Sequence, residues 1–221
     1  MTRADLAARV NELWLPALGQ PGRYTRQGER FDSVVKHLFG GDLPLRRLGL
    51  QRYYVRNMMR YPRSEILGRA GSTLHIRYRI DSGLGVDEDE LNRKIRRFAP
   101  EAGVRSRETN PVFGEPTGRL SVPVLTIHET GDAWIPFSQE QAYRRRTLAA
   151  GTSHLLVQRA VRGPAHCGFD SEVREQAFDD LVAWIERGIK PHGDDVLAAD
   201  VSKLGLRWTP ILYPDDPARR P

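Results

Sequence analysis

Two residues with acid–base side chains, Asp132 and His166, each follow a short apolar segment and a turn. Asp132 comes after residues 122–128, an apolar run of strand length. His166 follows a second such run at 155–161. A carboxylate can orient an imidazole, and the imidazole can then take a proton from a hydroxyl nucleophile. The pair therefore predicts the acid and the base of a relay that activates a nucleophile.

The elements that must position this pair are two strand-loop-helix units in succession. Ser138 and Gln141 form a capping-box pattern at the start of the first helix, and Gly151 stands where that helix should stop. Ser171 opens the second helix, which Gly188 should end. The second helix carries four apolar residues on one face, namely Phe178, Leu181, Val182 and Ile185. This order is typical of an α/β fold, in which parallel strands present functional groups at their carboxyl ends.

Residues 119–191 resemble the C-terminal portion of a serine α/β-hydrolase. The matching segments are VPVLTIHETGDAWIP at 122–136, GPAHCGF at 163–169 and AWIERG at 183–188. The resemblance implies a partial α/β-hydrolase fold, with Asp132 as the triad acid and His166 as the base. It also implies an ester or amide as a small-molecule substrate, with no cofactor.

Three large apolar residues flank the two loops, namely Trp134, Ile135 and Phe169. They are candidate walls of an acyl or aromatic pocket, and core packing is the equal alternative. Cys167 lies beside the candidate base, but adjacent residues usually point apart, so we do not expect it to serve as the nucleophile. His128 is close to Asp132 in sequence, and we expect it to be packed or solvent-facing. The other histidines (His37, His75, His154 and His192) have no metal-ligand spacing, so we expect no metal.

The nucleophile of the family is missing from the chain. It sits on a G-x-S-x-G turn, and no such motif occurs. The nearest serines, Ser72 and Ser82, lack the two flanking glycines. The strands that precede the lid in the family are missing too, and a sheet of two strands leaves an exposed edge. We therefore expect a segment that is inactive alone. Either an upstream polypeptide supplies the missing strands, or the segment has an incomplete sheet and is prone to associate through this edge.

Charge and composition divide the chain into three regions. Residues 1–119 hold 22 Lys and Arg against 14 Asp and Glu, whereas residues 120–221 hold 12 against 14. The proline- and glycine-rich stretch 110–118 marks the change. We expect a basic, mainly helical region at 1–118 that resembles a hydrolase lid, the α/β segment at 119–191, and an extension at 192–221 that wraps onto the surface.

The first region carries three helical patterns and one strand pattern. Helical spacing of apolar residues covers 6–14 and stops at Pro16, a second helix is predicted at 45–61, and a third continues from the cap at Asp87 to Phe98. Residues 74–80 alternate between apolar and polar side chains as a strand does. Because no second strand is nearby, this segment must pair elsewhere or lie extended.

An arginine-rich window at 46–79 holds nine arginines, one acid and four tyrosines. This composition admits a nucleic-acid-binding module, with phosphates neutralised by arginine and bases stacked on aromatic rings. No known binding motif accompanies the charge, so solvated helix faces are the favoured interpretation and nucleic acid is the least favoured partner.

Soluble character follows from hydropathy. The chain has no apolar run of 18 residues and no signal-peptide pattern, so as written it is expected to be cytoplasmic and without a membrane partner, although a longer parent could be secreted. Three functions stay open. They are the hydrolase segment, which we favour, a non-catalytic interaction module that has lost its activity, and the nucleic-acid-binding module.

Overall fold

A computed structural model describes residues 5, 8–20, 22–56, 71–106, 108 and 114–219. The fold is mixed α and β, and it divides into two compact units. Unit 1 comprises Met1–His37 and Arg56–Glu115, and unit 2 comprises Leu38–Val55 and Pro116–Pro221. Residues 38–55, which the sequence analysis grouped with the first region, therefore belong with the α/β segment.

Unit 1 begins with a helical stretch that continues past the proline expected to end it. The elements are η1 (Val10–Trp14), α2 (Leu15–Leu18), β1 (Gly19–Gln20), β2 (Arg23–Tyr24), α3 (Arg26–Phe39, whose last two residues belong to unit 2) and α6 (Glu88–Lys94). Pro16 lies in the first turn of α2. Proline is tolerated there because the first N–H groups of a helix have no intrahelical partner. The prediction of a stop at Pro16 was wrong for this reason.

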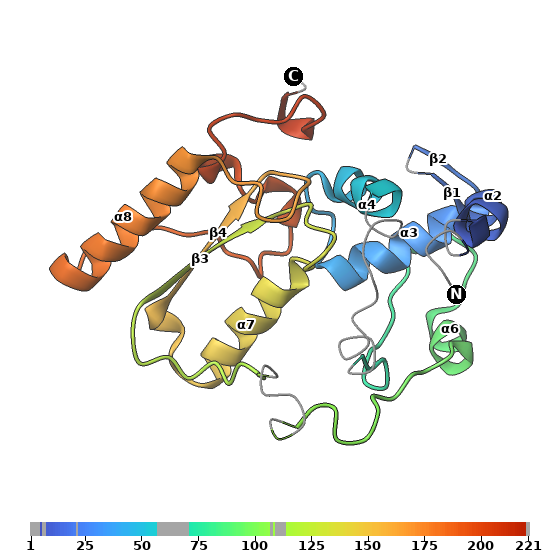
Figure 1. Ribbon diagram of the computed structural model, residues 1–221, viewed down its shortest axis with the longest axis horizontal. Coiled ribbons are helices and arrows are strands. Elements are labelled where there is room, and N and C mark those ends of the chain that lie inside the picture. The colour runs from blue at the N-terminus through green and yellow to red at the C-terminus, as the bar shows by residue number, and fades with distance from the viewer. Residues whose placement is uncertain are drawn as a thin grey trace. The chain divides into compact units, whose positions relative to one another are not determined.

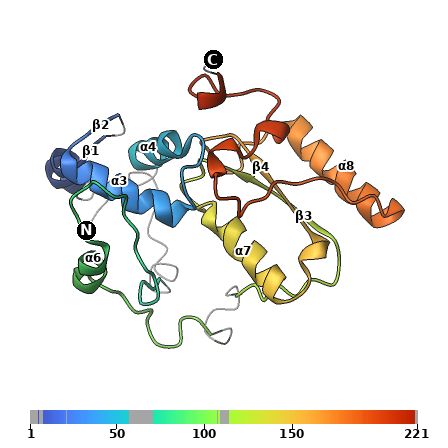
Figure 2. The same cartoon turned by 180° about the vertical axis from the view of Figure 1, so that it is seen from behind.

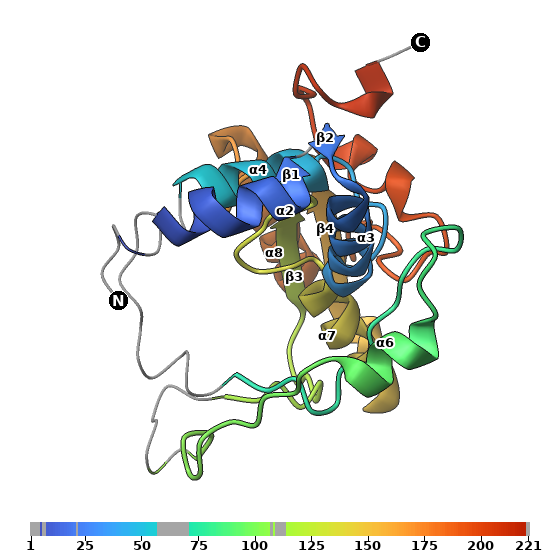
Figure 3. The ribbon, with the colours of Figure 1, turned by 90° about the vertical axis from the view of Figure 1, so that its right-hand side faces the viewer.

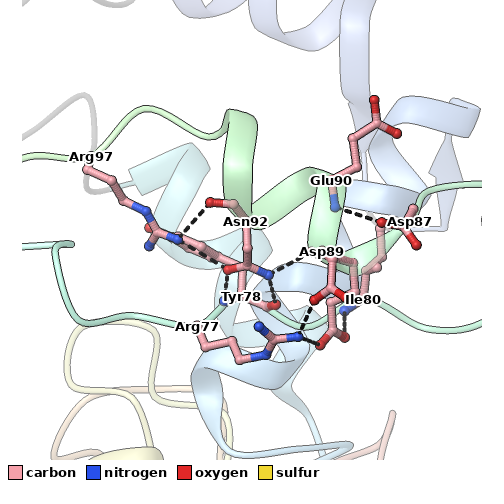
Figure 4. A network of polar contacts seen from close by, with 9 residues as sticks. Arg77, Tyr78, Ile80, Asp87, Asp89, Glu90, Asn92 and Arg97 are labelled. Carbon is pink, nitrogen blue, oxygen red and sulfur yellow. Dashed lines mark hydrogen bonds and ion pairs between the residues drawn. The ribbon is translucent and has the colours of Figure 1, made fainter.

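The segment predicted as a strand at 74–80 is not a strand: Leu74 and His75 lie in a turn, and residues 76–80 have no regular secondary structure. Its backbone is paired with a side chain: Tyr78 N donates to Asn92 Oδ1 at 2.9 Å, and Asn92 Nδ2 donates to Tyr78 O at 2.7 Å (Figure 4). Asp87 caps α6 as predicted, since its carboxylate accepts from Glu90 N at 2.7 Å. The helix ends at Lys94, short of the predicted Phe98.

Unit 2 is built on two parallel strands, β3 (Val124–Glu129) and β4 (Leu156–Val161), in the register Val124 to Leu156. Its helices are α4 (Arg46–Arg56), α7 (Ser138–Ala149), η2 (Ser153–Leu155) and α8 (Ser171–Arg187). α7 and α8 flank the strands in the chain order predicted from the sequence (Figures 1 and 2). Residues 57–61 of the predicted second helix lie outside the described residues.

Side-chain contacts place α7 and α8 on opposite faces of the strand pair. Glu140 of α7 accepts hydrogen bonds from Thr126 Oγ1 and Gln158 Nε2, both at 2.6 Å. These two residues are partners in the register and so share one face. Arg159, the next residue along β4, donates instead to Asp180 of α8 at 2.5 Å. Successive strand residues point to opposite faces, so the two helices cover both.

Two details of these helices differ from the sequence predictions. Ser138 is not the cap of α7, because the N-cap position falls on Phe137 and no side chain caps it. Gln141 is buried and donates to Gly40 O and Val196 O instead. On α8, Phe178 and Ile185 are 66% and 60% exposed. The buried residues of α8 are Ala177, Ala183 and Trp184.

The C-terminal extension does more than wrap onto the surface, because it covers the outer edge of β4. Asp194 N donates to Gln158 O at 2.7 Å, and Asp194 Oδ2 accepts from Ala160 N at 2.8 Å. Beyond this contact come η3 (Val201–Lys203), η4 (Leu206–Trp208) and η5 (Pro217–Arg219). Val196, Val201 and Leu204 join Phe137 and Ala160 in the core. Figure 3 shows the extension, in red, on the β4 side of the strand pair.

The outer edge of β3 is not covered in this way. Every residue of β4 is buried, whereas Val124 to His128 of β3 are all half-buried. Among the described residues, the backbone of Val124 to His128 forms no hydrogen bond beyond those to β4. None of the helices in the described ranges is long and apolar enough to cross a bilayer.

Candidate functional site

The site lies where β3 and β4 end, and the two loops that follow them are bonded to each other. Thr130 N donates to Val161 O at 2.9 Å, and Gly131 N donates to Gly163 O at 2.8 Å. A Cβ on Gly131 would lie 2.7 Å from Leu45 O, so only glycine fits there. Backbone hydrogen bonding between the two segments thus continues beyond the end of β3. It brings the loop with Asp132 beside the loop with His166.

Asp132 and His166 are in direct contact. Asp132 is 3% exposed, and its Oδ2 lies 2.7 Å from His166 Nδ1. Its other oxygen, Oδ1, accepts from Trp134 N at 2.7 Å and from Ile135 N at 3.1 Å. These three bonds fix the carboxylate group and make Nδ1 of the imidazole the donor. Nε2 of His166 is then left to accept a proton.

The imidazole of His166 is held from the side by an indole. The rings of Trp134 and His166 stack with centroids 5.7 Å apart and an interplanar angle of 10°. Tyr53 of α4 packs edge-on against the same indole, at 5.9 Å. The His166 side chain is 42% exposed, so the histidine is positioned but open to a reacting molecule. The sequence pattern does not assign Tyr53 to this site, because α4 is distant from both loops in sequence.

Of the three predicted pocket residues, Trp134 is the one whose ring stacks on that of His166. Ile135 contributes through its backbone. Its N–H donates a hydrogen bond to Asp132 Oδ1, and its carbonyl oxygen lies 2.9 Å from His128 Nε2. The residue is 46% exposed. Phe169 is half-buried, and its carbonyl accepts from Arg174. His128 is packed, with its ring 5.6 Å from that of Phe137.

The thiol of Cys167 lies closer to the imidazole of His166 than the side chains of adjacent residues usually lie. Its φ of 55° is left-handed, and its Sγ is 3.9 Å from His166 Nε2. The expectation that the thiol points away from the imidazole was therefore wrong, because the unusual backbone turns the side chain back. The separation is at the outer limit of a hydrogen bond to sulfur, and the thiol is exposed.

A further acid, Glu129, lies beneath both loops and was missed by the sequence analysis. It is 3% exposed, and burial raises the pKa of its carboxyl group, as does the neighbouring Asp132 to a smaller degree. Hydrogen bonds from Gly168 N and Ala165 N oppose the shift. A charged residue at the end of an apolar run is the signal that could have identified it.

No family model matches this chain. A search of curated proteins and a search of solved structures also found no match. The side chains at the ends of β3 and β4 are therefore the features that point to a function.

The described part of the chain shows no metal centre. His, Cys, Asp and Glu side chains there form no group of three suited to a metal ion. The arginine window is divided between the two units. Arg46 is 1% exposed, Arg52 stacks on Tyr213, and Arg77 pairs with nearby acids. Arg60, Arg63 and Arg69 lie outside the described residues.

Proposed function

We propose that unit 2 carries the acid–base half of a serine-hydrolase relay that acts on an ester or amide. The observation that supports this most directly is the 2.7 Å contact between Asp132 Oδ2 and His166 Nδ1, with Asp132 Oδ1 already bonded to two backbone N–H groups. The carboxylate selects one tautomer of the imidazole and stabilises its protonated form. The fold in this proposal is the C-terminal part of an α/β-hydrolase.

In the proposed reaction, His166 Nε2 takes the proton from a serine hydroxyl as its oxygen attacks the substrate carbonyl carbon. The same proton then passes to the leaving alcohol or amine as the carbon–oxygen or carbon–nitrogen bond breaks. A water molecule, activated by His166 in turn, releases the acyl group. Asp132 stays ionised throughout. The stacked indole of Trp134 keeps the imidazole in its plane while Nε2 exchanges the proton.

The serine and the oxyanion-binding N–H groups are proposed to come from another polypeptide, because the chain has no G-x-S-x-G motif. The outer edge of β3 is the proposed docking place. Val124 to His128 are half-buried, and within the described structure their backbone makes hydrogen bonds only to β4. These are features of an edge that accepts another strand. The coding sequence upstream of Met1 tests this directly: a frame with strand patterns and G-x-S-x-G supports it.

The state of His166 tests the relay within this chain. We expect ¹⁵N–¹H correlation spectra to show neutral His166 protonated at Nδ1, and Asp132→Asn to shift the proton to Nε2. In a complex with the polypeptide that supplies the serine, hydrolysis of p-nitrophenyl acetate should fall in His166→Ala. The matched control is His154→Ala, which removes an exposed histidine from the same unit. The relay would be refuted if neutral His166 carried its proton on Nε2 both in the wild type and in Asp132→Asn.

The second candidate is a non-catalytic interaction module, and the open edge of β3 is the observation that favours it. Both candidates bind a strand, so the discriminating experiment is a fluorophosphonate probe for active serines. The chain alone should not be labelled under either hypothesis. Labelling of a complex with the polypeptide that binds β3, together with its loss in His166→Ala, supports the hydrolase. A complex that forms but is not labelled supports the interaction module.

A further inference from the structure

Glu129 is the last residue of β3 and lies three residues before Asp132. It is 3% exposed, and no Lys or Arg in the described part of the chain forms an ion pair with it. The charged or titratable groups that act on its carboxylate are Asp132 and His128. An acid buried without a cation is costly, so its hydrogen bonds must compensate.

Those hydrogen bonds come from the loop that carries His166. Gly168 N donates to Glu129 Oε2 at 2.7 Å, and Ala165 N donates to Glu129 Oε1 at 3.4 Å. One donor precedes His166 and the other follows Cys167. The carboxylate therefore holds this stretch of loop at both ends and leaves the imidazole between them facing Asp132.

Two glycines allow the loop to approach the carboxylate this closely. A Cβ on Gly163 would lie 2.0 Å from Glu129 Oε1, and a Cβ on Gly168 would lie 3.3 Å from both oxygens. The first of these distances is far below any real contact, so residue 163 must be glycine while Glu129 occupies its place. The loop and the carboxylate are thus fitted to each other.

We propose that Glu129 is a positioning residue for the relay: it holds the 165–168 loop so that His166 Nδ1 stays on Asp132. This inference rests on the proposed function. It adds to the site a second buried carboxylate, which binds backbone N–H groups of the loop and touches no reacting atom.

The hold of Glu129 on the 165–168 loop should depend on pH. Burial raises the pKa of Glu129, so protonation begins at a higher pH than for an exposed glutamate. A protonated carboxyl group has one oxygen that donates and cannot serve both loop N–H groups equally. The loop should therefore loosen as the pH falls through the raised value, and Glu129→Gln should remove this dependence.

The test compares Glu129→Ala and Glu129→Gln with Glu175→Gln, which changes an exposed glutamate of α8. Two signals are measured: deuterium exchange of the Gly168 amide and the ¹⁵N tautomer state of His166. In Glu129→Ala we expect exchange of Gly168 to rise about tenfold, as for the loss of one hydrogen bond to a charged group, and His166 to lose its preference for Nδ1–H. Glu129→Gln should lie between, because its amide keeps one acceptor.

A purely structural role would change the exchange of the β4 amides and leave the tautomer alone. Gly163→Ala provides a second route if Glu129→Ala fails to fold, since its methyl group would occupy the place of the carboxylate, displace Glu129 from the loop N–H groups and produce the same two changes. The proposal would be overturned if Glu129→Ala, Glu129→Gln and Gly163→Ala all kept the wild-type tautomer of His166 and the wild-type protection of the Gly168 amide. If wild-type His166 itself lacks Nδ1–H while Gly168 protection still depends on Glu129, the proposed function fails and the loop contact stands.

Discussion

The two strands of unit 2 differ in what covers their outer edges. β4 is closed by the C-terminal extension, whose Asp194 bonds both Gln158 O and Ala160 N as a neighbouring strand would. β3 has no equivalent among the described residues, and Val124 to His128 are only half-buried. Unit 2 is therefore finished on one side and open on the other. The relay residues Asp132 and His166 lie at the strand ends, where the open side would bring a further strand close.

The closed side depends on a buried ion pair, which provides the largest expected effect. Arg162 NH1 lies 2.6 Å from Asp216 Oδ1, with the two side chains 2% and 0% exposed. Asp216→Ala leaves the buried guanidinium without its partner, so we expect the free energy of unfolding to fall by about 3–5 kcal/mol. Urea denaturation measures it. Arg145→Ala, at an exposed arginine of α7, should change little. A loss below about 1 kcal/mol in Asp216→Ala would mean that the extension is not an integral part of the unit.

The open side should be visible as association. Phe178 is 66% exposed on α8, the helix that packs against β3. Leu148 is 51% exposed on α7, which packs against β4. We expect concentration-dependent self-association in sedimentation experiments, with Phe178→Glu weakening it about tenfold, as expected for the loss of one buried aromatic contact. Leu148→Glu should have no such effect. Equal effects of the two substitutions would show that the open edge has no special role.

The pattern of the sequence identified the parts of the site that depend on local order. Both strands, both loops and the stop at Gly188, whose φ is 71°, lie where apolar runs and glycines placed them. What the pattern could not supply are contacts between distant residues. The exposed face of α8, the burial of Gln141 and the edge contact of Asp194 depend on which surfaces meet in unit 2. Glu129 was missed because its partners are backbone N–H groups, which no side-chain pattern records.

The smallest expected effect concerns Asp194, the residue that closes β4. Burial raises the pKa of its carboxyl group, and the hydrogen bond from Ala160 N opposes this. Between the ordinary pKa of an aspartate, about 3.9, and the raised value, the folded protein holds a proton that the unfolded chain has lost. The free energy of unfolding should therefore fall as the pH rises through this window.

Asp194→Asn removes the titrating group and keeps an oxygen that can accept from Ala160 N. Relative to this variant, the wild-type protein should lose stability as the pH is raised from below 4 toward neutrality. Denaturation midpoints measured across that range provide the comparison. Asp195→Asn, at the exposed neighbour, should follow the wild-type curve. Parallel curves for wild type and Asp194→Asn would mean that the carboxylate on β4 is solvated, and the two edges of the sheet would then differ less than the structure indicates.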